Sequence, residues 1–387
     1  MARQSSKKAN KSGSAKWWVS VFGGAVACLV LLVFLSFNNA YSISLFGAPI
    51  AYVRGVSSST AATPAPVLDK VAYDKKLLSL AHVASTSPWY NAFLAGTTTP
   101  LDAEGNATTT TTKQPLWPVK RTYPNAGALL PFNRIVAYYG NFYSTGMGIL
   151  GEYPPDQVLA MLASTTAEWK AADPSTPVIP AIDYIAVTAQ ASAGSDGMYR
   201  ARMPDSQIQK AITLANEIHG IVILDIQVGL SNVQTEIPLL KQYLELPNVE
   251  IAIDPEFSMK DGTPPGKEIG TFDASDINWV ANYMAGIVNT SNLPPKILVV
   301  HRFTEDMVTN YKKITPLPEV QIVMDMDGWG FPAKKVNTYQ QVIEPEPVQF
   351  TGFKLFYKAD LQAPAYRLMT PQEVLSLTPA PIFIQYQ

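Results

Sequence analysis

Apolar runs alternate with amphipathic segments from Phe132 to the end of the chain. Short apolar runs bounded by polar residues predict buried strands, and apolar positions at helical spacing between them predict helices. The strands expected from this pattern are Arg134–Gly140, Val178–Val187, Ile221–Gly229, Val249–Phe257, Lys296–Phe303, Val320–Gly328, Gly352–Lys358 and Ile382–Gln387. The helices expected between them are Asp156–Ala171, Ser206–His219, Val233–Leu244, Asp276–Val288, Thr304–Ile314, Pro332–Ile343 and Thr370–Leu377.

Strands that alternate with helices predict a parallel sheet. Eight strands over about 255 residues fit a (β/α)8 TIM barrel. An open doubly wound sheet is the alternative, but its glycine-rich loop after the first strand is absent from this sequence. Several connections from strand to helix are long, such as 141–155 and 188–205. Long loops of this kind build the face of a barrel that carries its active site.

The N-terminal part of the chain has the pattern of a membrane anchor. Trp17–Phe37 is an apolar run of 21 residues without a charge, which is long enough to cross a bilayer. Basic residues precede it without any acidic residue, so the N-terminus is expected to stay in the cytoplasm. Cleavage after Ala40, or lipid attachment at Cys28, are alternatives. Each interpretation places the remainder outside the cytoplasm, and we expect a single-pass protein of the cell membrane.

Composition divides the chain into four parts. These are a basic cytoplasmic tail (1–16), a transmembrane signal anchor (17–37), a Ser/Thr/Pro-rich stalk (38–131) and the barrel domain (132–387). The stalk contains low-complexity tracts that are too poor in apolar residues to bury a core, with one short helix expected over Leu68–Ala84.

Charge and cysteine content exclude some classes of protein. The formal net charge is −2, without a basic stripe or a nucleic-acid-binding motif, so no nucleic-acid partner is expected. The single cysteine cannot form an internal disulfide.

The chemistry of the predicted barrel centres on the segment Val249–Met259, VEIAIDPEFSM. Side chains alternate along a strand, so Asp254 and Glu256 are expected to point the same way. Pro255 cannot donate to a sheet ladder, so the strand is expected to end there. An acidic pair at the last inward positions of a strand is typical of a hydrolytic site.

The same alternation places other polar side chains inward near strand ends. They are Asp183, Asp225, Gln227, either His301 or Arg302, Asp325, Asp327, Lys354 and Gln385. Unpaired buried charges are costly, and these carboxylates exceed the cations available to pair with them. Such crowding raises the pKa of a carboxyl group and suits a general acid.

Structural and metal-binding interpretations of these residues stay open. Asp183 and Asp225 could form hydrogen bonds inside the barrel without touching a ligand. Asp325 and Asp327 could hold Ca²⁺ or Mg²⁺. However, the His-x-His pattern of metal-dependent barrel hydrolases is absent after the first strand, so no metal or cofactor is expected.

The strand that ends in Asp254-Pro255-Glu256 resembles the Asp-x-Glu strand of TIM-barrel muramidases and chitinases. The resemblance implies that Glu256 is the proton donor to the glycosidic oxygen and that Asp254 supports it. The terminal IFIQYQ is similar to the last strand of the muramidases, which implies that Gln385 and Tyr386 lie at the site. The first-strand aspartate of muramidases has no counterpart in RIVAYYGN. The phrases IDPEFSM, MDMDGWG and GFKLFYKAD also resemble an uncharacterised barrel domain of secreted bacterial proteins.

These features favour a membrane-anchored glycan hydrolase that acts on cell-wall or surface polysaccharide, including peptidoglycan. The catalytic candidates are Glu256, Asp254, Asp327 and Asp325, and aromatic residues near the strand ends, such as Trp329, could stack on sugar rings. The other residues expected to bind the substrate are Asp183, Asp225, Gln227, His301, Arg302, Lys354, Gln385 and Tyr386. A non-catalytic glycan-binding or wall-tethering module is the alternative. A metal-dependent esterase or deacetylase that uses Asp325 and Asp327 is a third possibility.

The predicted topology can be tested on intact cells that express the protein. Protease added outside should release a soluble fragment cut in the Thr-rich segment 96–115, because exposed low-complexity segments are preferred cleavage sites. The fragment is detected by immunoblotting against the barrel domain. Protection of the whole chain until the cells are lysed would reverse the predicted orientation.

Overall fold

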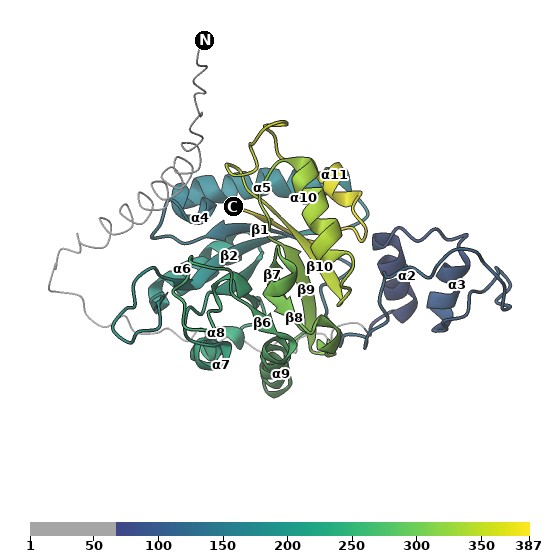
Figure 1. Ribbon diagram of the computed structural model, residues 1–387, viewed down its shortest axis with the longest axis horizontal. Coiled ribbons are helices and arrows are strands. Elements are labelled where there is room, and N and C mark those ends of the chain that lie inside the picture. Colours follow the sequence, from purple (N-terminus) through teal and green to yellow (C-terminus); the bar gives the residue numbers. More distant parts are fainter. Residues whose placement is uncertain (1–66) are drawn as a thin grey trace, which may run out of the picture. The chain divides into compact units, whose positions relative to one another are not determined.

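The computed structural model describes residues 67–387, and its centre is a closed barrel of eight parallel strands (Figure 1). The barrel strands are β1 (Arg134–Gly140), β2 (Val178–Ala189), β4 (Ile221–Ile226), β5 (Val249–Ile253), β7 (Lys296–Arg302), β9 (Val320–Met326), β10 (Phe350–Leu355) and β11 (Phe383–Tyr386). Closure comes from β1, which pairs in parallel with both β2 and β11. The predicted parallel barrel of eight strands is therefore confirmed, with strand ends shifted by a few residues.

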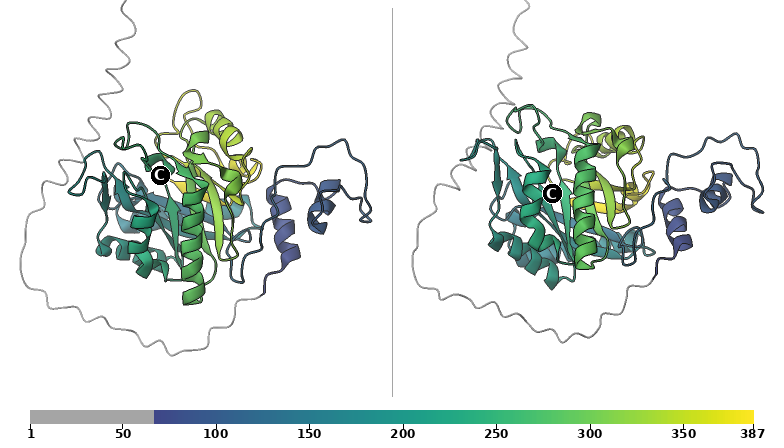
Figure 2. Two further views of the ribbon diagram at one scale, coloured as in Figure 1. Left: turned by 60° about the horizontal axis from the view of Figure 1, so that its bottom comes forward. Right: turned by 90° about the horizontal axis from the view of Figure 1, so that it is seen from below.

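Helices surround the strands (Figures 1 and 2). They are α4 (Ile149–Glu152), α5 (Pro155–Ala172), α6 (Asp205–Glu217), α7 (Val233–Glu236), α8 (Lys241–Leu244), α9 (Ala274–Ser291), α10 (Pro332–Thr338) and α11 (Pro371–Leu375). A short strand β3 (Arg200–Arg202) pairs antiparallel with β2, and β6 (Phe272–Asp273) pairs with β8 (Val308–Thr309).

The helix predicted over 304–314 is wrong. This connection contains two 3₁₀ turns, Glu305–Met307 and Tyr311–Lys313, on either side of β8. The guanidinium of Arg302 donates to the carbonyl oxygens of Thr304 and Glu305. Asn310 adopts a left-handed conformation with φ of 58°, so the chain cannot continue as an α-helix through this point.

The barrel interior changes from apolar to polar along each strand. On β4, Ile223 is followed inward by Asp225, and on β9, Val323 is followed by Asp325. The apolar inward residues join a hydrophobic cluster near the strand starts, while the outward residues, such as Ile251, form the larger cluster beneath the helices. The polar groups consequently gather at the carboxyl ends of the strands, where barrel enzymes carry their active sites.

Residues 67–131, the described part of the predicted stalk, contain two helices, α2 (Lys70–Leu80) and α3 (Pro88–Ala95). Leu77, Leu80 and Leu130 are buried in the same cluster as the first residues of the barrel strands. The side chain of Gln321 also bonds the main chain of Leu130 at both its N–H and its carbonyl. This segment is folded against the barrel because its few apolar residues cover the strand starts. The domain boundaries themselves stay a prediction.

The predicted anchor over 17–37 lies outside the described residues. Within 67–387, no helix has the length and apolar character needed to cross a membrane. The anchor and its alternatives at Cys28 and Ala40 remain predictions.

Candidate active site

A solvent-accessible cavity of about 280 Å³ lies at the carboxyl ends of the barrel strands. Of the residues predicted for the site, Gln227, Asp254, Glu256, Asp327, Trp329 and Lys354 line it. Tyr139, Gly146, Met147, Ile185, Ala189, Phe257, Phe303, Phe356 and Gln387 complete the lining. Side chains from the ends of several barrel strands therefore share one cavity.

Asp254 and Glu256 reach the cavity from a turn rather than from a continuous strand. β5 ends at Ile253, and Asp254 caps a 3₁₀ turn over Pro255–Phe257. The Asp254 Oδ1 accepts a hydrogen bond from the Glu256 main-chain N–H at 3.0 Å. The shared direction of the two carboxyl groups therefore comes from this cap, because the strand pleat does not extend to Glu256.

Both carboxyl groups of this pair favour the protonated form. Burial, followed by the negative charge of Asp327, raises the pKa of Glu256 to about 7, and the charges of Lys354 and His301 oppose the shift. Burial, followed by the charge of Glu256, raises the pKa of Asp254 well above its usual value. Crowding of carboxylates was expected to be the cause, but loss of water contact contributes more to both shifts.

Asp327 has a fixed cationic partner in the cavity wall. The Lys354 Nζ lies 3.2 Å from Asp327 Oδ1 and 3.8 Å from the centre of the Tyr139 ring. Burial disfavours the charged amine, yet the charges of Asp327, Asp225 and Asp254 outweigh it and raise the pKa of Lys354. The Gln227 Nε2 donates to the hydroxyl of Tyr139 at 3.2 Å, so Tyr139 is held from both sides.

His301 is buried and bridges two aspartates inside the barrel. Its Nε2 lies 3.1 Å from Asp225 Oδ2, and its Nδ1 lies 3.0 Å from Asp325 Oδ2 and 3.7 Å from Asp327 Oδ2. Burial lowers the pKa of His301, but the charge and hydrogen bond of Asp225 and the contacts with Asp325 and Asp327 raise it well above 6.5 overall. His301 is therefore an imidazolium that donates from both nitrogens to carboxylates.

Gly352 on β10 makes room for this network. A Cβ atom added to Gly352 would lie 2.4 Å from Asp325 Oδ1, closer than side-chain atoms approach one another. Gly352 is also the register partner of Asp325 across the β9–β10 ladder. The glycine thus allows the carboxylate of Asp325 to lie against the neighbouring strand.

Asp183 and Gln385 form a second pair inside the barrel. The Gln385 Nε2 donates to Asp183 Oδ2 at 2.6 Å, and neither residue is exposed. Burial, followed by the charge of Asp225, raises the pKa of Asp183 well above its usual value. Asp183, Asp225, His301, Asp325 and Gln385 do not line the cavity, so direct contact with a ligand, predicted for several of them, is not supported by their positions.

Arg302 and Tyr386, two further predicted ligand contacts, lie outside the barrel interior. The Arg302 guanidinium is 2.5 Å from the Glu346 carboxylate, on the side opposite to His301. The Tyr386 hydroxyl accepts a hydrogen bond from Trp169 Nε1 at 2.9 Å, and its ring stacks on Tyr357. Both follow from strand alternation, because each residue is next to an inward one.

The arrangement of charges does not favour a metal site at Asp325 and Asp327. Residues 67–387 contain no group of three or more histidine, cysteine or acidic side chains placed to hold an ion. The two carboxylates face the positive charges of His301 and Lys354, which would repel a cation.

Phe303 and Phe356 line the cavity but were absent from the predicted site. Phe303 shares the parity of His301, and Phe356 shares the parity of Lys354, so the same alternation rule could have found them. Both residues are apolar, whereas the pattern that predicted the site was one of polar inward residues.

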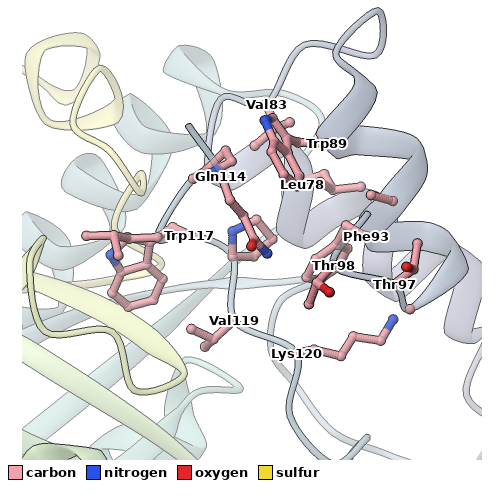
Figure 3. A pocket seen from close by; sticks show the side chains of 15 residues that line it. Leu78, Val83, Trp89, Phe93, Thr97, Thr98, Gln114, Trp117, Val119 and Lys120 are labelled. Carbon is pink, nitrogen blue, oxygen red and sulfur yellow. The ribbon is translucent and has the colours of Figure 1, made fainter. Parts of the chain in front are cut away.

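A second cavity, about 270 Å³, lies beside α2 and α3 (Figure 3). Trp89, Phe93 and Trp117 are among the side chains around it, and Lys120 is the titratable group in its lining. Its lining contains no carboxyl group that could act as an acid or a base, so the barrel cavity is the candidate active site.

Comparison with known sequence families and with curated proteins gives no match to this chain. Among solved structures, a hyperthermophilic endo-β-1,4-glucanase in complex with substrate is similar with a TM-score of 0.36 and 8% identity, covering 66% of this chain and 89% of that one. A xyloglucan-specific GH5 endo-β-1,4-glucanase from a metagenomic library, in complex with cellotriose, gives a TM-score of 0.34, 10% identity, and coverage of 64% and 81%. A GH18 chitinase from Pseudoalteromonas aurantia gives a TM-score of 0.26, 10% identity, and coverage of 65% and 79%. These neighbours are glycoside hydrolases, but scores at this level assign neither a family nor an activity.

The bridging role of His301 predicts the effect of removing its charge. His301→Gln should lower the free energy of unfolding by about 3–5 kcal/mol at neutral pH, because Asp225 and Asp325 lose their buried cation. Since the pKa of His301 is raised, its stabilisation is complete below about pH 6.5 and is lost as the pH rises through its folded-state pKa. Urea unfolding measures both effects.

The matched control is the exposed His219, whose replacement by Gln should change stability by less than about 0.5 kcal/mol. Equal stability of His301→Gln and the wild type at neutral pH would show that the imidazolium does not hold the two aspartates.

Proposed function

We propose that this protein is a glycan hydrolase in which Glu256 is the general acid. One observation carries the proposal: Glu256 is a partly buried carboxyl group at an accessible cavity, and its pKa is raised to about 7. A general acid works best when its pKa lies near the operating pH. The adjoining carboxyls of Asp254 and Asp327 complete the set that glycoside hydrolysis requires.

Each carboxyl group takes a distinct role in the proposed reaction. Glu256 transfers its proton to the glycosidic oxygen as the bond from that oxygen to the anomeric carbon breaks. Asp254 stabilises the turn that contains Glu256, because its Oδ1 accepts a hydrogen bond from the main-chain N–H of Glu256. Asp327, beside Lys354, either stabilises the positive charge of the oxocarbenium-like transition state or accepts a proton from the water that attacks the anomeric carbon.

The aromatic lining supports a sugar as the ligand. Trp329 lines the cavity with 51% of its surface exposed, and Lys334 covers its ring at 4.0 Å from the centre. An exposed aromatic ring beside carboxyl groups is suited to stack on the apolar face of a sugar while polar groups bind its hydroxyls. Cell-wall or surface polysaccharide is the proposed substrate, with the protein attached to the membrane through the segment 17–37.

A glycan-binding module without turnover is the second candidate. The observation that favours it is the inward position of Tyr139 on β1, the strand that carries an aspartate in the muramidases that the sequence resembles but contains none here. The ring of Tyr139 lies under Lys354, so this corner of the cavity offers binding surface rather than a further acid or base.

Turnover by a Glu256→Gln variant separates the two candidates. With a glycan identified by screening, the variant should keep binding while turnover falls roughly a hundredfold or more, the scale for losing a general acid. Wild-type kcat should decline as the pH rises through about 7, because Glu256 then loses its proton. The exposed Glu305→Gln serves as the control and should leave kcat unchanged.

Unchanged turnover in Glu256→Gln would reject Glu256 as the acid. Tight binding without product from the wild type would favour the binding module.

The charge of the cavity predicts the charge of its ligand. Three carboxyl groups line the cavity together with one ammonium group, Lys354, which is already paired with Asp327. At pH values above about 7, where Glu256 has lost its proton, a glycan identified by screening should therefore bind at least about tenfold more tightly than its C6-oxidised, uronic acid form, because like charges repel in a partly buried site. Isothermal titration measures both affinities.

Asp327→Asn should reduce the difference in affinity between the glycan and its oxidised form, because the variant removes one carboxyl group from the cavity. Tighter binding of the oxidised form to the wild type would contradict the predicted preference for uncharged or cationic glycans.

A further inference from the structure

A buried ion pair, Lys335 with Asp360, lies close to the cavity. The proposed roles of Asp254 and Glu256 do not explain why this pair is present. Asp360 and Lys335 are each 1% exposed, and the Lys335 Nζ lies 3.1 Å from Asp360 Oδ2. Lys335 lies on α10, in the segment that follows β9, and Asp360 lies in the segment that follows β10. The first of these segments contains Trp329 and the second contains Phe356, and both aromatic residues line the cavity.

The ion pair bonds the main chain next to each aromatic residue. Asp360 Oδ1 accepts from the Gly330 N–H at 2.8 Å, and Asp360 Oδ2 accepts from the Phe356 N–H at 2.9 Å. Lys335 Nζ donates to the Gly328 carbonyl at 2.7 Å. The main chain is thus held on both sides of Trp329 and at Phe356 itself.

We propose that Asp360 and Lys335 are positioning residues that hold Trp329 and Phe356 together as the sugar-binding wall of the cavity. The assignment of sugar as the ligand rests on the proposed function. The positioning role rests on the hydrogen bonds alone.

Two features of the main chain and side chains support positioning. Gly330 has a φ of 141°, a conformation that side-chain-bearing residues rarely adopt, so this loop needs a specific partner to define its course. Two buried ammonium groups lie near the Phe356 ring, with Lys335 Nζ at 5.0 Å and Lys354 Nζ at 5.2 Å from its centre. A displaced Phe356 would therefore disturb Lys354, the partner of Asp327 in the cavity.

Stability alone does not explain this pair. Apolar residues of similar volume often replace a buried ion pair without loss of stability. Burial lowers the pKa of Lys335 to about 8 although Asp360 opposes the shift, which shows how little solvent the amine retains. What apolar residues cannot supply is the set of hydrogen bonds to Gly328, Gly330 and Phe356.

The barrel provides a matched control at a distance from the cavity. Glu250 and Lys296 are also buried, on β5 and β7. Glu250 Oε2 accepts from the Ile297 N–H at 2.6 Å, and Lys296 Nζ donates to the Val249 carbonyl at 2.8 Å. None of these residues lines the cavity, so Glu250→Gln reproduces the loss of a buried carboxylate without the positioning role.

Amide hydrogen exchange of the full chain tests the proposal without a ligand. In Asp360→Asn, one carboxylate oxygen becomes an amide that cannot accept, so exchange at Gly330 or Phe356 should quicken about tenfold or more. The double variant Lys335→Met/Asp360→Leu removes the buried charges together and should quicken exchange at both amides. Glu250→Gln should quicken exchange at Ile297 and leave Gly330 and Phe356 as in the wild type.

The proposal is overturned if the folded double variant protects Gly330 and Phe356 as the wild type does. It is also overturned if Glu250→Gln loosens these amides equally, since the effect would then be general destabilisation.

Binding supplies the second readout. For a glycan that the wild type binds, the double variant should raise Kd about tenfold, while Glu250→Gln should leave Kd unchanged. An unchanged Kd in the double variant would reject the role of the wall in binding. If the wild type binds no glycan in the screen, the proposed function fails, whereas the exchange result still decides whether Asp360 and Lys335 position the loops.

Discussion

The polar interior at the carboxyl ends of the barrel strands depends on one interaction, the contact of the His301 imidazolium with both Asp225 and Asp325. A barrel interior that contains several carboxyl groups is unstable unless cations or protons neutralise them. His301 supplies one positive charge to two aspartates at once and lies 3.7 Å from a third, Asp327. Gly352 completes this arrangement because its missing side chain leaves the space that Asp325 occupies.

The same charges determine the chemistry of the cavity. Lys354 pairs with Asp327, and burial together with the charge of Asp327 raises the pKa of Glu256. Two carboxyl groups in one cavity thus acquire different roles: one is paired with cations and the other favours its proton. Separation of this kind is the usual way in which a single fold supplies both an acid and a negatively charged partner near neutral pH.

The alternation of strands and helices along the sequence predicted the barrel, and the alternation of side chains along each strand predicted which polar residues point inward. The inward positions of Asp225, Asp325 and Gln385 follow from the strand pattern, as do those of Gln227, Asp327 and Lys354 in the cavity lining. Alternation could not distinguish a residue that lines the cavity from one buried below it, because depth along the barrel axis depends on the stagger between strands. It also left His301 and Arg302 as alternatives, and the pairing of His301 with aspartates from two other strands depends on tertiary contacts.

Other differences arose where local pattern and tertiary structure compete. The predicted helix over 304–314 is absent because Arg302 and Asn310 impose turns. Glu256 leaves the strand pleat because Asp254 caps a 3₁₀ turn. The folding of 67–131 against the barrel was missed because Thr-rich composition outweighed a few apolar residues that cover the strand starts.

The central claim is that Glu256 carries a proton near neutral pH because it is partly buried beside Asp327. Its carboxyl pKa can be measured directly by ¹³C NMR titration, with the resonance assigned by its loss in Glu256→Gln. The account predicts a midpoint of about 7 in the wild type and a lower midpoint in Asp327→Asn, because the charge of Asp327 contributes to the shift. A midpoint near the ordinary glutamate value of about 4.3, unchanged in Asp327→Asn, would contradict it.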